Sequence, residues 1–260
     1  MNQLYNSITS NLLTILIVGF LFYFFFLRKK KQTQTVQLQQ QAKKEAEAIG
    51  VVIKTDGTSR SGSETEYSGQ TGGIDWKLKS EVRISSQDIS KQVWERTSSW
   101  RTDTVKLPVG KFLMLMSAPG YNSSAHSLKQ GGFLNKLVNM AADFALDIYV
   151  EGYFGSQYKS MINVGDSIKI EKPALQGFLI LTNIEPLTQK FLDDSTVNVI
   201  ANWKKQKLGF TREGNVDQFG LLFSQDGVIL SCQADMANAE EAKTFSDFGS
   251  VLCVKMKGIM

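Results

Sequence analysis

Histidine, cysteine and proline are scarce in this chain. Its 260 residues include one histidine, two cysteines and four prolines. A single imidazole excludes metal sites that need two histidines, such as those of the His-Glu-x-x-His proteases. Two cysteines are too few for a disulfide-rich scaffold, and a chain with 42% hydrophobic residues does not have the composition of a disordered protein. The composition therefore indicates a globular protein, and its motifs match no family that we recognise.

Charged side chains are missing from the first 27 residues. Residues 8–27 are predominantly apolar, and about 20 such residues are enough for a helix to cross a bilayer. A cleaved signal peptide would need a basic region before this run and a small-residue cleavage site after it, and the sequence has neither. The sequence therefore predicts a tail over 1–7 and a single transmembrane helix over 8–27.

Four cations follow the apolar run directly: Arg28, Lys29, Lys30 and Lys31. The basic flank of a spanning helix stays in the cytoplasm, where it is attracted to anionic lipid headgroups. We therefore expect a protein of a bacterial inner membrane, with the tail outside and the C-terminal domain in the cytoplasm. The alternative is inverted topology, in which Cys232 and Cys253 could form a disulfide.

The net charge of +4 comes from one short segment. Between Arg28 and Ile49 there are six cations and two anions, so the remaining cations and anions of the chain are equal in number. Binding to a nucleic-acid backbone requires clustered basic charge. A neutral domain does not favour this, and we expect the lipid bilayer and a membrane-associated protein as partners instead.

The composition divides the rest of the chain into three parts. Residues 28–50 are a basic collar and a Gln-rich stretch of good helix formers, which predicts a helical stalk. Its apolar residues do not keep a heptad repeat, so the sequence does not predict a stable coiled coil, and self-association through the stalk is left as an alternative. Residues 51–73 are rich in Gly, Ser and Thr and predict a flexible linker. Residues 74–260 form the predicted domain.

Alternation of apolar and polar residues over 74–84 predicts a strand with one face in the core and one in water. The apolar patterns predict an α+β domain, with a mainly antiparallel sheet packed with two or three helices. Further strands are expected over 100–105, 111–116, 167–170, 178–182 and 250–257, helices over 133–146, 186–192 and 196–203, and a hairpin over 219–232 with a type I′ turn at Asp226-Gly227.

No group of residues matches a known catalytic, cofactor or metal motif. His126 lies in a polar loop among serines without a Gly-x-Ser-x-Gly elbow. Asp247-Phe248-Gly249 lacks the other protein-kinase motifs. Cys232 and Cys253 are interpreted as buried residues of strands. The sequence thus predicts no cofactor and no metal, and favours a protein that is not an enzyme.

One cluster has the composition of a binding surface. Trp94, Arg96, Trp100 and Arg101 lie within eight residues, and Trp and Arg are enriched at binding hot spots. The alternative is that the indoles are core residues. The function predicted is a membrane-anchored scaffold, adaptor or regulator. The alternative is an enzyme of unrecognised type that acts on a membrane-proximal substrate, with acids such as Asp143, Asp147 or Asp193 in a pocket.

Overall fold

The computed structural model describes residues 20, 23, 37–38, 40–59, 62–84, 94–118, 146–161, 168–169, 172–205 and 215–260. The chain divides into two compact units, Met1–Glu47 and Ala48–Met260. The predicted transmembrane helix lies outside the described residues, apart from Phe20 and Tyr23. None of the helices in the described part of the chain is both long and apolar enough to span a membrane. Residues 37–38 and 40–48 are helical, within the segment predicted as a stalk.

The second unit is built on one antiparallel sheet, which confirms the predicted α+β class. Its nine described strands lie in the order β1-β2-β3-β4-β9-β8-β5-β7-β6, and all neighbours are antiparallel. The strands are β1 (Val51–Ser59), β2 (Gly62–Thr71), β3 (Ile74–Ile84), β4 (Trp94–Thr102), β5 (Leu113–Ser117), β6 (Ile168–Lys169), β7 (Phe178–Thr182), β8 (Asn215–Ser224) and β9 (Gly227–Gln233).

Several predicted elements are confirmed. β3 has the predicted bounds, and its alternation buries Ile74, Trp76 and Leu78 on one face. β7 also has the predicted bounds. β8 and β9 form the predicted hairpin. The predicted helices over 186–192 and 196–203 are α3 (Glu185–Phe191) and α4 (Asp194–Lys205). The predicted helix over 133–146 lies outside the described residues except at its last position, where a described helical segment runs over 146–154.

The predicted linker over 51–73 is wrong, because β1 and β2 occupy it. Its Thr, Val and Tyr residues suit a strand, and Tyr67 is buried with its hydroxyl donating to the Met236 carbonyl at 3.2 Å. Gly72 and Gly73, with φ of 60° and 75°, close the tight turn between β2 and β3. Positive φ at both central residues is the mark of a type I′ turn.

The turn at Gln225-Asp226 is not the predicted type I′. No described residue other than glycine has a positive φ, so Asp226 does not, whereas Gly227 has a φ of 118°. An added Cβ at Gly227 would collide with the Thr102 carbonyl oxygen of the neighbouring β4. Glycine is required here both for the backbone angle and for the close approach of β4 to β9.

The predicted strand over 250–257 is also wrong, because it lies inside the helix α5 (Ala239–Ile259). Phe245, Phe248, Leu252 and Met256 recur every three or four residues, and all are buried. The helix begins where Asn238 Oδ1 accepts a hydrogen bond from the Glu241 amide at 2.9 Å. Taken alone, the short run Val-Leu-Cys-Val at 251–254 fits a strand as well as a helix. The helical spacing is evident only when Phe245 and Phe248 are included.

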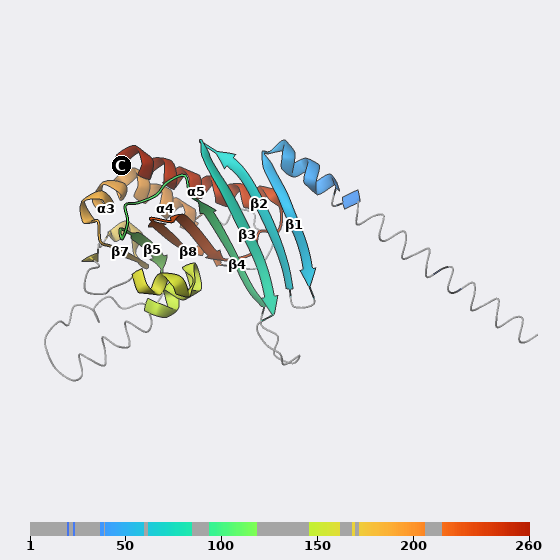
Figure 1. The fold of residues 1–260 in the computed structure, drawn as a ribbon, viewed down its shortest axis with the longest axis horizontal. Coiled ribbons are helices and arrows are strands. Elements are labelled where there is room, and N and C mark those ends of the chain that lie inside the picture. The colour runs from blue at the N-terminus through green and yellow to red at the C-terminus, as the bar shows by residue number, and fades with distance from the viewer. Residues whose placement is uncertain are drawn as a thin grey trace, which may run out of the picture. The chain divides into compact units, whose positions relative to one another are not determined.

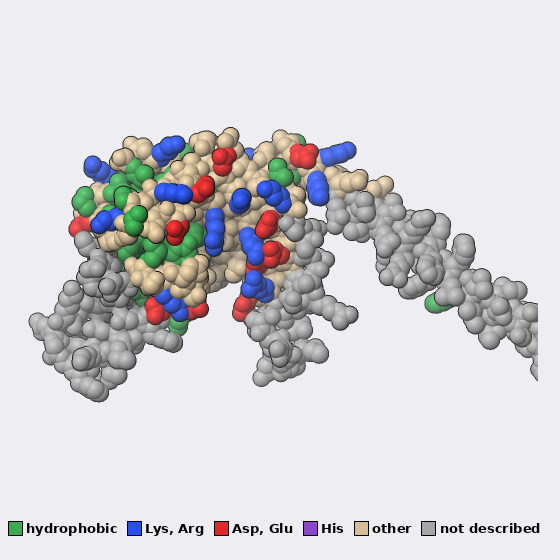
Figure 2. Space-filling model, viewed as in Figure 1, with side chains coloured by type: hydrophobic (Ala, Val, Ile, Leu, Met, Phe, Trp, Pro, Cys, Tyr) green, Lys and Arg blue, Asp and Glu red, His purple; other side chains and the backbone are tan. Residues whose placement is uncertain are grey.

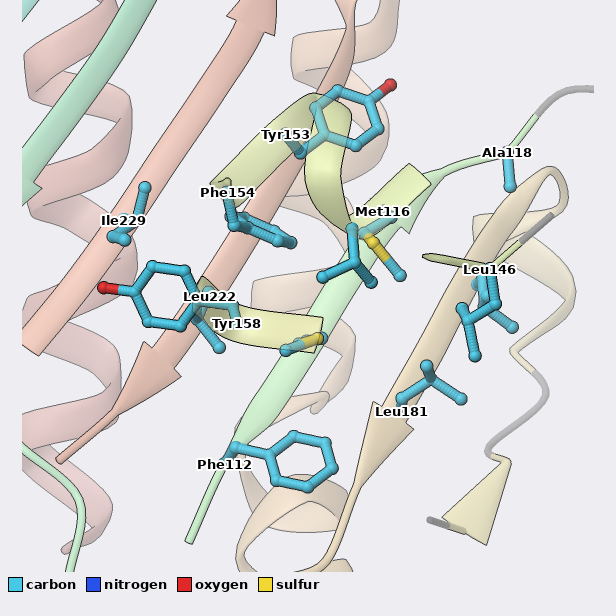
Figure 3. Packing of buried hydrophobic residues seen from close by; sticks show 13 residues of the cluster. Phe112, Met116, Ala118, Leu146, Tyr153, Phe154, Tyr158, Leu181, Leu222 and Ile229 are labelled. Carbon is cyan, nitrogen blue, oxygen red and sulfur yellow. The ribbon is translucent and has the colours of Figure 1, made fainter. Parts of the chain in front are cut away.

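The two halves of the sheet are covered differently. α5 contacts β1, β2, β3 and β4 and, in Figure 1, runs across the back of these strands. On the opposite face, residues 146–154 and the 3₁₀ helix η3 (Ser156–Met161) pack over β5, β7, β8 and β9. Figure 3 shows Tyr153, Phe154 and Tyr158 from these segments beside Met116 and Leu222. No described helix covers the same face of β2, β3 and β4.

Candidate functional site

One row of residues that pair across neighbouring strands shows where the cover formed by residues 146–161 ends on the sheet. The strand register aligns Ser68, Lys77, Arg101, Ile229, Leu222, Met114 and Leu181 across the sheet. Four members of this row are buried in the core cluster beneath residues 146–161: Ile229, Leu222, Met114 and Leu181. Lys77 and Arg101 are exposed. The change from apolar to charged residues within one row indicates that this part of the sheet faces solvent.

We call the solvent-facing side of β2–β4 the open face. Figure 2 shows Lys, Arg, Asp and Glu side chains gathered over these strands. Its residues alternate with the buried ones along each strand. They are Glu64, Glu66 and Ser68 of β2, Asp75, Lys77, Lys79, Glu81 and Arg83 of β3, and Glu95, Thr97, Ser99 and Arg101 of β4.

A groove of about 540 Å³ lies where the open face meets the covered half. Ser68, Lys77, Arg101 and Ile229, which share one register row, line it. Further lining residues come from the neighbouring elements: Val52 of β1, Asp75 of β3, Asp103 after β4, Tyr158 of η3 and Asp226 in the β8–β9 turn. The groove therefore combines an apolar side with charges of both signs.

Four of the nine charged residues on the open face form ion pairs with one another. Lys79 Nζ lies 3.1 Å from Glu64 Oε2 and also pairs with Glu81, whose other oxygen is 2.6 Å from Arg83 Nη2. The hydrogen bond to Glu81, with a smaller contribution from Glu64, raises the pKa of Lys79 above its ordinary value. Glu81 is largely shielded from solvent, but its partners Lys79 and Arg83 are partly exposed, so these pairs hold side-chain geometry more than they stabilise the fold.

Lys77 and Arg101 are arranged differently. They lie directly opposite each other on β3 and β4, and both are exposed. Among the described residues neither forms an ion pair with a carboxylate, and Arg101 Nε donates only to Ser99 Oγ at 3.4 Å. Asp75, the nearest acid along β3, accepts from Gln70 Nε2 at 2.9 Å. The groove thus contains two adjacent cations without a carboxylate partner in the described structure.

The four residues predicted as a partner surface do not form one patch. Alternation along β4 places Arg96 and Trp100 on the α5 side and Arg101 on the open face. Trp100 is fully buried, and Arg96 Nη1 pairs with Asp235 Oδ1 at 2.8 Å. The side chain of Trp94 lies outside the described residues. Of the three whose side chains are described, Arg101 lines the groove and Arg96 and Trp100 do not.

The other candidate residues are accounted for as follows. Cys232 and Cys253 are buried, not bonded to each other, and burial raises the pKa of both thiols to about 12. Asp193 accepts from the Thr196 amide at 2.7 Å, which caps α4 and lowers the pKa of Asp193. Asp147 is exposed and does not line the groove. The remaining predicted residues lie outside the described part of the chain: His126, Asp143, Arg28, Lys29, Lys30 and Lys31.

The described residues contain no group of three or more His, Cys, Asp or Glu side chains that could hold a metal ion. Sequence reasoning missed Lys77, Asp103, Tyr158 and Asp226 as groove residues. Alternation along β3 showed that Lys77 points to solvent. That Lys77 lies opposite Arg101 depends on the pairing of β3 with β4, which no local pattern specifies.

Comparison of the chain with protein-family models, with curated proteins and with solved structures found no match. The function has to be argued from the residues of the chain itself.

Proposed function

We propose that the chain is a single-pass membrane protein whose α+β domain binds a protein partner through the open face and its groove. The observation that carries the proposal is the half-covered sheet. One face of β5, β7, β8 and β9 is closed by residues 146–161, whereas the same face of β2–β4 has no described cover. The boundary between the two halves forms a groove of about 540 Å³.

The anchor in this proposal is the apolar segment 8–27, followed by Arg28, Lys29, Lys30 and Lys31. The basic flank favours a cytoplasmic position for everything after it. Anchoring confines the domain to the membrane surface and raises its effective concentration for a partner in the same membrane. A weak binding surface, without a large apolar patch, is then enough for an adaptor or scaffold.

A partner that uses the open face should be lost when that face is changed. We would purify the tagged full-length chain from its own cells in detergent and identify co-purifying proteins by mass spectrometry. Thr97→Arg changes an exposed residue of the open face, and Val251→Arg changes an exposed residue of α5. We expect a membrane protein that co-purifies with the wild type and with Val251→Arg but not with Thr97→Arg. Equal recovery with both variants, or no specific partner, would contradict the proposal.

The topology is tested with the same exposed position. In intact cells, Thr97→Cys should resist a membrane-impermeant maleimide and react once the membrane is permeabilised. Reaction in intact cells would favour the inverted topology instead.

A second candidate function shares the groove. Its volume falls within the range of small-molecule sites, which is compatible with an enzyme that acts on a membrane-proximal substrate. Partner loss with Thr97→Arg distinguishes the two, because a small-molecule site alone gives no co-purifying protein.

A further inference from the structure

Lys77 and Arg101 differ from the other cations of the open face. Lys79 and Arg83 each pair with a glutamate, whereas no described carboxylate pairs with Lys77 or Arg101. Like charges directly opposite each other on neighbouring strands repel and destabilise the sheet. An anionic group placed between them would relieve this repulsion and gain two attractions.

The other charges of the groove narrow the chemistry of that group. Asp75, Asp103 and Asp226 line the same groove, so its three acids outnumber its two cations. A nucleic acid or a multiply charged phosphate would be repelled by these acids. A protein segment can place a carboxylate near the cations and amide or ammonium donors near the acids, which satisfies both signs of charge.

The apolar side of the groove fits the same occupant. Tyr158 and Ile229 are largely buried and line the end of the groove next to the covered half, whereas Val52 of β1, half exposed, lines the opposite end. Aliphatic or aromatic side chains next to the charged residues of a segment could pack there. The groove follows one register row, from Ser68 through Lys77 and Arg101 to Ile229, and therefore crosses several strands.

We infer that the groove binds an extended segment of mixed charge from the partner protein, with a carboxylate of that segment held between Lys77 and Arg101. This inference rests on the proposed function and specifies the chemistry of its partner. In this inference the groove determines which segment binds: the cation pair selects an acidic residue, and the surrounding acids repel polyanions.

A random library of linear peptides tests the inference without knowledge of the partner. The library is selected on the detergent-solubilised full-length chain, and binding of the recovered peptides is then measured by titration. We expect peptides enriched in Asp or Glu beside basic or amide side chains. Reversing both cations, with Lys77→Glu and Arg101→Glu, should weaken binding at least about tenfold, and the loss should shrink at high salt.

Lys79→Gln is the matched control, because Lys79 lies on the same strand and face but already pairs with Glu64 and Glu81. It should change affinity less than about twofold. A recovered peptide whose acid is replaced by Lys should in turn bind the doubly reversed variant better than the wild type. Circular dichroism of each variant checks that the fold is retained.

Three results would overturn the inference: recovered peptides without an essential acid, equal binding by the doubly reversed variant, or no peptide that depends on the groove. Binding of inorganic phosphate that depends on Lys77 and Arg101, with no such peptide, would also overturn it. If a partner still co-purifies with the full-length chain and is lost with Thr97→Arg, only the inference fails. If no partner co-purifies, the proposed function fails as well.

Discussion

The two halves of the sheet share strands of the same kind but differ in what covers them. Leu222 of β8 and Lys77 of β3 occupy the same register row and the same face. Leu222 is fully buried beneath residues 146–161, and Lys77 is exposed. The covered half thus has a core on both faces, whereas the β2–β4 half has a core only on the α5 side. This difference separates residues that maintain the fold from residues that face solvent.

Leu222→Ala should give the largest effect. It removes a fully buried side chain from the doubly covered half and should lower the free energy of unfolding by about 2–5 kcal/mol. Lys77→Ala, in the same row, should change it by less than about 0.5 kcal/mol. Pulse proteolysis of the solubilised full-length chain in urea measures both. Similar losses for the two variants would show that the open face is covered after all.

Gly227→Ala tests the junction between the halves, where β9 of the hairpin meets β4. Its φ of 118° and the clash of an added Cβ with the Thr102 carbonyl should cost about 1–3 kcal/mol of unfolding free energy. Gly110→Ala is the control, since Gly110 has a φ of 73° but nothing within 4 Å of an added Cβ, and it should cost about 1 kcal/mol. A smaller loss at Gly227 than at Gly110 in the same assay would be inconsistent with close packing of β4 on β9.

Thiol reactivity separates the α5 side of the sheet from the open face. Cys253 in α5 and Cys232 in β9 are buried, and burial raises the pKa of both thiols to about 12. Both should therefore resist a maleimide at neutral pH until the protein unfolds, whereas an introduced Thr97→Cys on the open face should react in the native state. Fast labelling of either native cysteine would place the α5 side in contact with solvent.

The raised thiol pKa values also give a pH dependence of stability. The folded thiols keep their protons at pH values where the unfolded thiols, with pKa near 9, lose theirs. This contribution to stability is present below about pH 9 and declines as the pH rises toward about 12. The fall in unfolding free energy above pH 9 should be smaller in Cys253→Ala, measured by urea denaturation, than in the wild type.

Arg101→Gln should have only a small effect on stability, and the sign of that effect is informative. Removing one of two like charges that face each other should leave the free energy of unfolding unchanged or raise it by about 0.2–1 kcal/mol, less at high salt. Arg83→Gln, which breaks an ion pair with Glu81, should not raise it. A clear loss of stability in Arg101→Gln would mean that Arg101 has a structural partner.

Local patterns in the sequence predicted the elements whose signal is contained in a few residues. The alternation of β3, the apolar run of β7 and the β8–β9 hairpin are examples, although the type I′ turn predicted for that hairpin is wrong. The Gly/Ser/Thr-rich segment was misinterpreted as a linker because its composition outweighed the hairpin signal of Gly72-Gly73. Residues 250–257 of α5 were misinterpreted because a short apolar run fits a strand as well as a helix.

The groove could not be predicted in the same way. It depends on which strands pair and in which register, and these are long-range properties. Arg101 was selected from the sequence as part of a Trp/Arg cluster, yet its relevant neighbour is Lys77 on β3. Trp100, selected for the same reason, belongs to the core, where an added Cβ at Gly249 would lie only 3.1 Å from its indole ring.

The most direct test of the open face as a binding surface is site-specific photo-cross-linking in intact cells. A photoreactive amino acid is placed in the full-length chain at Ser99 on the open face or at Val254, which is exposed on α5. We predict a cross-link to one membrane protein from Ser99 that disappears with Lys77→Glu and Arg101→Glu, and no such product from Val254. Cross-linking of the same partner from Val254 but not from Ser99 would contradict the account.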